Sequence, residues 1–220
     1  MKEIKLITKI HKSTKRNYLE RMNDNKVACM KVAKKYGFDY WDGDRKYGYG
    51  GYKYILGKWD GVAKNLIKRY KLNNNSKVLD VGCGKAYLLY EIKKILPNII
   101  IKGLDISNYG IKKAFPSVKN FLFKHDIRKG LYYKKNAFDL VISLACLHNL
   151  EINHLTKVIK KIDYIAKRKF IMVESYRNNK ELFNLQCWAL TCESFFSKNE
   201  WKWIFKNNHY KGDYEFIYFE

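Results

Sequence analysis

The feature that most constrains the fold of this chain is the run VLDVGCG at residues 78–84. A short β-prone stretch leads directly into a glycine turn, and a helix through residues 88–92 is expected to follow. Helix-like segments separate further apolar stretches that are typical of buried strands, at residues 98–105, 121–126, 138–143 and 169–174. Strands that alternate with helices in this way predict a mostly parallel central sheet, so we expect an α/β fold with helices on both faces.

The alternating pattern covers residues 60–220, and residues 1–59 differ from it in character. Residues 1–35 are typical of a basic helical segment, whereas residues 36–60 are irregular and rich in glycine and tyrosine, above all at residues 43–54. Irregular segments of this length are usually functional, so we expect a lid over a binding site rather than a packed surface loop. The side chains expected to touch a ligand are Arg45, Tyr47, Tyr49 and Tyr52. We expect both parts to form one structural unit, ending in an edge or antiparallel strand at residues 214–219.

The net charge of +23 has two explanations. It favours a polyanionic partner, such as nucleic acid or an acidic membrane surface. It is also what a drift toward Lys, Asn, Ile and Tyr would produce, and this is the explanation we favour. Lysine pairs are spread along the whole chain, and no block of five consecutive basic residues occurs.

The remaining composition indicates an ordinary reduced protein. No run approaches the ~20 apolar residues of a membrane span, and the charged N-terminus lacks the features of a signal peptide, so we expect a cytoplasmic location. The five cysteines are scattered without metal-ligand spacing, which predicts neither a disulfide nor a zinc site.

Acidic residues end three consecutive predicted strands, at Asp80, Asp105 and Asp126. Ligands bind where the carboxyl ends of parallel strands meet, so we expect these carboxylates to surround a single ligand. Each acid alone would be interpreted as a helix N-cap or a turn residue. The set of three beside a glycine turn favours a binding site.

The glycine turn narrows the class of ligand. Gly82 and Gly84 let the backbone approach a ligand where a Cβ would collide. A dinucleotide fingerprint would place a third glycine at position 87, where this chain has Tyr87, so a pyrophosphate is not expected. The first carboxylate suits an amino group and a sulfonium, the second suits both hydroxyls of a ribose, and the third suits the amino group of an adenine.

In order and spacing, residues 77–84, 104–105, 125–127 and 138–143 resemble the successive motifs of the class I S-adenosylmethionine-dependent methyltransferases. The resemblance covers about residues 60–175. It implies the Rossmann-like fold of that superfamily, S-adenosylmethionine as methyl donor and S-adenosylhomocysteine as product. It places the methionine part of the donor at Asp80, Gly82 and Gly84, the ribose at Asp105 and Ile106, the adenine at Asp126 and Ile127, and the floor of the site at Ser143.

The segments that flank these motifs are similar to a bacterial subgroup of such enzymes, which we associate with the modification of small molecules and surface carbohydrates. They are residues 42–52, 147–150, 174–177 and 212–214. One departure from the superfamily is that a single clear strand follows the last helix. We therefore expect the usual antiparallel strand pair at the sheet edge to be shortened.

Candidates for the methyl-transfer step lie after the fourth and fifth predicted strands. His148 suits a general base or a packing role equally. Glu174 could bind a cationic or hydroxylated acceptor, or could cap a helix. Tyr176 and Arg177 could hold an acceptor, with the guanidinium binding a carboxylate or phosphate unless it is a plain surface charge. Several aromatic residues could wall a pocket, although helical spacing favours a core role for most, including Trp188, Trp201 and Trp203.

We therefore expect an enzyme that methylates a small polar acceptor: a sugar, a nucleotide-linked metabolite or an amine, at oxygen or nitrogen. The alternative suggested by the charge is an RNA or DNA methyltransferase. No Asn-Pro-Pro-Tyr-type motif follows the fourth strand, where the chain reads SLAC at residues 143–146. A cofactor-binding scaffold for a partner protein ranks last, because Asp80 and Asp105 are both present. One continuous basic face would favour nucleic acid, and an even spread of lysines would favour drift.

Overall fold

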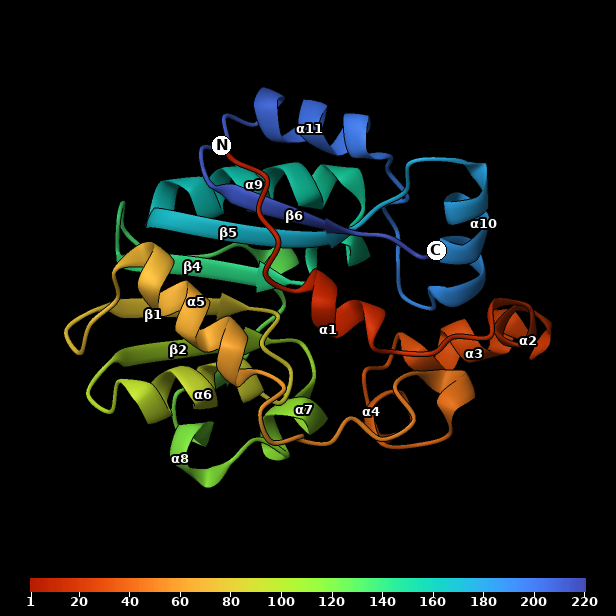
Figure 1. The fold of residues 1–220 in the computed structure, drawn as a ribbon, viewed down its shortest axis with the longest axis horizontal. Coiled ribbons are helices and arrows are strands. Elements are labelled where there is room, and N and C mark those ends of the chain that lie inside the picture. The colour runs from red at the N-terminus through yellow and green to blue at the C-terminus, as the bar shows by residue number, and fades with distance from the viewer.

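A computed structural model describes all 220 residues, and its centre is one sheet of six parallel strands in the order β3-β2-β1-β4-β5-β6 (Figure 1). The direction of the strand order changes between β1 and β4, which are neighbours in the sheet. This is where an open parallel sheet forms a crevice for a ligand. The strands are β1 (Lys77–Val81), β2 (Ile100–Asp105), β3 (Leu122–Lys124), β4 (Phe138–Leu144), β5 (Ala166–Glu174) and β6 (Asp213–Ile217).

Helices cover both faces of the sheet, which confirms the expected class of fold. One face carries α5 (Asp60–Tyr70), α6 (Tyr87–Ile95), α7 (Asn108–Lys112) and α8 (Pro116–Lys119). The other carries α9 (Ile152–Ile165), α11 (Lys198–Asn207) and the 3-10 turns η2 (Ile127–Lys129) and η3 (Leu147–Asn149). A capping box formed by Ser197 and Glu200 begins α11. None of the helices is both long enough and apolar enough to span a bilayer.

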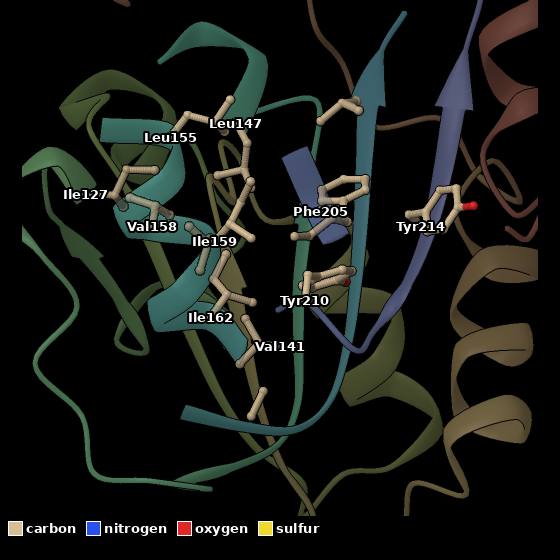
Figure 2. Close-up of a cluster of buried hydrophobic side chains, with 14 of the residues drawn as sticks. Ile127, Val141, Leu147, Leu155, Val158, Ile159, Ile162, Phe205, Tyr210 and Tyr214 are labelled. Carbon is tan, nitrogen blue, oxygen red and sulfur yellow. The ribbon is translucent and has the colours of Figure 1, made fainter. Parts of the chain in front are cut away.

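Each face of the sheet has its own apolar core, because side chains alternate along a strand. In β1, Val78 belongs to the core under α5 and α6, whereas Leu79 belongs to the core under α9 and α11. Figure 2 shows the second core, in which apolar side chains of α9 meet Val141 of β4. The α9 side chains are spaced three or four apart, so they form one stripe: Leu155, Val158, Ile159 and Ile162.

The last strand differs from one sequence expectation. β6 is an edge strand, as expected, but it pairs with β5 in parallel, from Phe170↔Asp213 to Glu174↔Ile217. The chain passes through α10 (Asn179–Trp188) and α11 between the two strands, and this crossover returns it in the same direction. No antiparallel strand is present in the sheet, so the pair expected to be shortened is absent.

The N-terminal segment covers the free edge of β6. The backbone N–H of Ile4 donates to the carbonyl of Tyr214 at 2.9 Å. The side chain of Glu215 is 1% exposed and accepts hydrogen bonds from the N–H groups of Leu6, Ile7 and Thr8. The Thr8 hydroxyl donates to the same carboxylate at 2.6 Å. This carboxylate therefore joins the start of the chain to the sheet.

The basic helical segment expected over residues 1–35 consists of three short helices: α1 (Thr8–Lys12), α2 (Tyr18–Asn23) and α3 (Lys26–Ala33). Asn17 and Asn25 begin the second and third of them as N-caps, since each side chain accepts from a backbone N–H. With α4 (Phe38–Trp41), the 3-10 turn η1 (Arg45–Tyr47) and α10, these helices lie on the side toward which the strand arrows point (Figure 1). They form a cap over the carboxyl ends of the strands.

Candidate functional site

A cavity of about 210 Å³ lies at the carboxyl ends of β1, β2 and β4, beneath the N-terminal cap. Five of the residues predicted to bind the ligand line this cavity directly, and one residue of the predicted lid covers the cavity. These six residues are Gly82, Asp105, Ile106, Asp126, Ile127 and Tyr49. The structure therefore brings together residues after three strands, from Gly82 to Ile127, which are 45 positions apart in the chain.

The two acids at the tips of β1 and β2 are both buried but differ in their partners. Asp105 accepts hydrogen bonds from the N–H groups of Gly84 and Ser107, each at 2.7 Å. Burial raises the pKa of Asp105, and these two N–H donors oppose the effect. Asp80 is 4% exposed, and no donor of the chain reaches its carboxylate; burial, together with the nearby charge of Asp105, raises its pKa to about 8. A buried carboxylate without a partner is costly, so Asp80 is a position that a cationic ligand group would stabilise.

Both glycines of the turn are required by their surroundings. Gly82 has φ +85°, and a Cβ there would lie 2.5 Å from the Cys146 side chain. Gly84 has φ +55°, and a Cβ there would lie 2.6 Å from the ring of Trp41. Both backbones are in the left-handed region that favours glycine. The second glycine thus allows the cap to close directly onto the turn.

At the tip of β3, Asp126 is held by its own neighbour. The guanidinium of Arg128 lies 2.7 Å from the carboxylate and lowers the pKa of Asp126. The Asp126 side chain also begins η2, where it accepts from the N–H of Arg128. It lines the cavity beside Ile127, so the carboxylate is fixed in an ionised form at the wall of the site.

The segment expected to form a lid, together with Trp41 of α4, lies against the glycine turn and turns aromatic rings toward it. Trp41 and Tyr49 stack with their centroids 5.2 Å apart, and Tyr52 stacks on Tyr87 at 5.3 Å. The Trp41 indole N–H donates to the Ser107 hydroxyl at 2.8 Å, so the lid is bonded to the loop after β2. The rings therefore cover the glycine turn and exclude water from it.

An ion pair between the buried Lys85 and the half-buried Asp42 joins the lid to the glycine turn. The Lys85 ammonium, 4% exposed, lies 2.7 Å from the Asp42 carboxylate and 2.7 Å from the carbonyl of Tyr52. The Tyr109 hydroxyl donates to the same carboxylate at 2.9 Å. Burial alone would raise the pKa of Asp42, but the hydrogen bonds from Lys85 and Tyr109 hold it below its ordinary value.

His148 and Glu174 lie side by side, and neither of them lines the cavity. His148 is 3% exposed, its Nδ1 accepts from the backbone N–H of Glu174 at 3.2 Å, and its Nε2 lies 3.5 Å from the Glu174 carboxylate. Both ring nitrogens are therefore engaged, and burial lowers the pKa of His148 although Glu174 opposes this. The neutral ring can orient the carboxylate, and the choice between a base and a packing role for His148 stays a prediction.

The other ten predicted site residues do not line the cavity: Asp80, Gly84, Ser143, His148, Glu174, Arg45, Tyr47, Tyr52, Tyr176 and Arg177. Ser143 is fully buried and its hydroxyl donates to the carbonyl of Val81 at 2.9 Å, so it joins β4 to β1 beneath the site. Tyr47 packs on a small cluster around α3. Tyr176 bridges to Ser197 at the start of α11. Arg177 pairs with Glu181 and Glu220, and the hydrogen bond that it donates to Glu181 raises its pKa, so its charge is already matched.

Several cavity residues were not predicted from the sequence. Trp41 and Tyr40 belong to α4, which lies in the segment interpreted as irregular. Asn149 and Thr191 meet at the opposite wall, where the Thr191 hydroxyl donates to the Asn149 side chain at 2.9 Å. The aromatic run at residues 36–41 was a usable signal, whereas nothing local marks Thr191. Trp201 is fully buried, as its helical spacing indicated, but Trp203 is exposed.

Comparisons with known proteins agree with this geometry. A family model described as a methyltransferase domain matches residues 72–209. Malonyl-(acyl-carrier protein) O-methyltransferase of Bacillus anthracis is 25% identical over 158 residues, which are 65% of this chain and 58% of that protein. Ribosomal RNA small subunit methyltransferase C of Buchnera aphidicola is 30% identical over 114 residues, which are 50% of this chain and 33% of that protein. The chain therefore spans between about a third and three-fifths of these relatives.

Among solved structures, geranyl diphosphate C-methyltransferase of Streptomyces coelicolor, in complex with Mg²⁺, geranyl diphosphate and S-adenosylhomocysteine, has the same fold. The superposition has a TM-score of 0.53 at 10% identity and covers 66% of this chain and 58% of that one. At this identity the likeness concerns the fold alone.

Proposed function

This chain belongs to the methyltransferase domain family, and on that premise we propose that it transfers a methyl group from S-adenosylmethionine to a small polar acceptor. The acceptor would be a sugar, a nucleotide-linked metabolite or an amine, methylated at oxygen or nitrogen. The observation that carries the proposal is the unpartnered, buried carboxylate of Asp80, whose pKa is raised by burial and by the charge of Asp105, a residue that lines the cavity. Only the segments that flank the motifs suggest the carbohydrate-modifying subgroup, so membership of that subgroup is part of the proposal.

The residues present fit the methyl donor. Asp80 would hold the ammonium of its methionine part, which would supply the missing partner of that carboxylate. Asp105 keeps free lone pairs on both oxygens and would accept from the ribose hydroxyls. Asp126 and Ile127 would bind the adenine. The rings of Trp41 and Tyr49 would face the sulfonium of the donor, because a cation that lies over an aromatic face is stabilised.

The donor supplies an already activated methyl group, so the chain's own task is to align the nucleophile and exclude water. The lid does both, because its rings seal the glycine turn from solvent. A hydroxyl nucleophile would also need a base, and we assign that role to Glu174. Burial raises the pKa of Tyr49, which lines the cavity, and the charges of Glu174 and Asp105 add to this effect. His148 then acts as a positioning residue that fixes the Glu174 carboxylate.

A turnover screen with radiolabelled S-adenosylmethionine tests the proposal, with sugars, nucleotide-sugars, amines and RNA as acceptors. We expect label in a small molecule. With that acceptor, Glu174→Gln should reduce kcat by a factor on the order of 10²–10⁴. His148→Ala should reduce it less and shift the pH profile, because the carboxylate stays but loses its orientation. Equal activity of Glu174→Gln and the wild type would remove the base assignment.

The second candidate is an RNA methyltransferase, favoured by the net charge of +23 and by the ribosomal RNA methyltransferase relative. The distribution of lysines argues against it. Exposed lysines occur on α5 and on α9, which lie on opposite faces of the sheet, as Lys64 and Lys160 illustrate. An even spread is what compositional drift produces. Turnover on RNA alone in the same screen would reverse this ranking.

A further inference from the structure

A second cleft, of about 470 Å³, lies beside η1 at the start of the lid, and arginines dominate it. Arg16, Arg21 and Arg45 converge on the ring of Trp188, with guanidinium carbons 5.4, 4.6 and 5.0 Å from its centroid. They come from the loop before α2, from α2 and from η1, and Trp188 ends α10. We call this group the arginine cleft.

The three guanidiniums are held by the ring and by backbone carbonyls, and none is neutralised. Arg21 donates to the carbonyls of Arg45, Gly48 and Trp188. Arg45 donates through one nitrogen, to the carbonyl of Tyr49. The salt bridge in this cleft joins Lys46 to Asp44 at 3.8 Å, and the three arginines form none.

Unused donors remain in the arginine cleft. The Nε of Arg16 is buried and has no hydrogen-bond partner, although its terminal nitrogens contact His11 and Thr14. A guanidinium has five N–H donors, so Arg45 also keeps most of its own. Burial lowers the pKa of all three arginines, and for Arg21, where the charge of Arg45 adds to the effect, it falls to about 10. Like charges gathered without partners are costly unless an anion joins them.

Three carboxylates also border the cleft: Glu20, Asp24 and Asp44. Asp44 is occupied, since it caps η1 and contacts Lys46. None of the three lies within 4.0 Å of the clustered guanidiniums, so they leave the charge around Trp188 unmatched. Together with Lys15 and Lys46, five cations face three acids.

We propose that the arginine cleft binds a phosphate group of the methyl acceptor. Planar guanidinium forks match phosphate oxygens in pairs, and three of them suit a dianion or a diphosphate better than a single carboxylate. This inference rests on the proposed function and narrows it, because among its candidate acceptors it selects a phosphorylated one such as a nucleotide-linked sugar.

The position of the cleft fits an acceptor that reaches from it to the methyl donor. Arg45 bonds to the backbone of Tyr49, whose side chain lines the donor cavity. Burial lowers the pKa of Arg16 and raises that of Tyr49, and the charge of Glu174 opposes the first shift and adds to the second. The phosphate would therefore be held on one side of lid residues 45–49, with the nucleophile directed toward Glu174 and the donor on the other side.

Calorimetry with inorganic pyrophosphate as the probe tests the inference, at about 0.15 M salt to weaken non-specific attraction. Arg45→Gln and Arg16→Gln should each raise the Kd about tenfold or more, as expected for the loss of a charge-assisted hydrogen bond. Lys64→Gln is the matched control, because it removes the same charge from an exposed residue of α5 and should leave the Kd unchanged. Circular dichroism confirms that each variant is folded.

S-adenosylhomocysteine binding to the same samples separates the two proposals. If the wild type binds S-adenosylhomocysteine but pyrophosphate binds the arginine variants as tightly as the wild type, the cleft inference fails alone. If S-adenosylhomocysteine does not bind at all, the proposed function fails. If a short RNA binds through Arg45 and Arg16 and displaces pyrophosphate, the cleft contacts a nucleic-acid backbone, and the small phosphorylated acceptor is overturned.

Discussion

Replacing Asp80 should make the protein more stable and a poorer binder of its donor. The pKa of the buried carboxylate is raised from the ordinary 3.8 to about 8. Between these values the folded protein keeps a proton that the unfolded chain has released, so the folded state binds more protons. The stability of the wild type therefore falls as the pH rises through this window, by about 1.4 kcal/mol per pH unit.

Asp80→Asn removes this dependence, because an amide carries no charge. The stability of the variant relative to the wild type should rise by on the order of 5 kcal/mol between pH 4 and pH 8, and then level off. An unpartnered buried amide costs about 1–3 kcal/mol, which shifts the whole curve but leaves its slope unchanged. In a chain of this size, each kcal/mol moves Tm by roughly 2–4 °C, so the change across the window is about 10 °C or more.

Urea unfolding followed by circular dichroism, from pH 4 to pH 9, measures the difference. Asp39→Asn is the control, since Asp39 is exposed on α4 and its replacement should change stability by less than about 0.5 kcal/mol at every pH. S-adenosylhomocysteine should stabilise the wild type and have little effect on Asp80→Asn, because ligand stabilisation follows affinity. A wild-type-to-variant difference that does not change with pH would show that Asp80 is not an isolated buried carboxylate, and the donor-site reasoning would fail.

Three further predictions concern the donor site and its lid. Asp105→Ala should weaken S-adenosylhomocysteine binding in calorimetry by about 100-fold, on the scale of one or two charge-assisted hydrogen bonds, and an unchanged affinity would contradict the ribose assignment. Gly84→Ala should also weaken binding, because its Cβ meets the Trp41 ring; adding Trp41→Ala should restore part of the affinity, and no restoration would show that the collision is unimportant. Lys85→Met should speed S-adenosylhomocysteine dissociation in stopped-flow measurements by breaking the lock to Asp42, and an unaltered rate would show that this ion pair does not control the lid.

The sheet and the three acidic residues near the strand ends could be predicted because both depend on the order of residues along each strand. Buried parallel strands are continuous apolar runs, and the residue after each run must face the same edge of the sheet. The positions of Asp80, Asp105 and Asp126 at the edge of the sheet could therefore be predicted without knowledge of tertiary contacts. The direction of β6 was less accessible, since a short alternating run pairs in either direction and the choice is made by the crossover through α10 and α11.

The residues that were misplaced depend on distant partners. Arg177 is a plausible anion binder by type, but Glu181 and Glu220 neutralise it, and Glu220 is 43 positions away. His148 has a suitable pKa by type, but the backbone of Glu174 occupies its Nδ1. The arginine cleft was missed for the same reason, because Arg16, Arg45 and Trp188 meet only after the cap folds. Residue type indicates what a side chain can do, and its partners decide whether it is free to do so.

The hydrogen bonds between the N-terminal segment and Glu215 have a practical consequence for the preparation of this protein. An open sheet edge is a template on which other chains can pair, and residues 4–8 close this one through the main chain. Trimming those residues would leave a carboxylate in the interior with four donors removed at once. Affinity tags and fusions are therefore better attached through a flexible spacer ahead of Met1, and N-terminal truncation should yield aggregates rather than a smaller soluble enzyme.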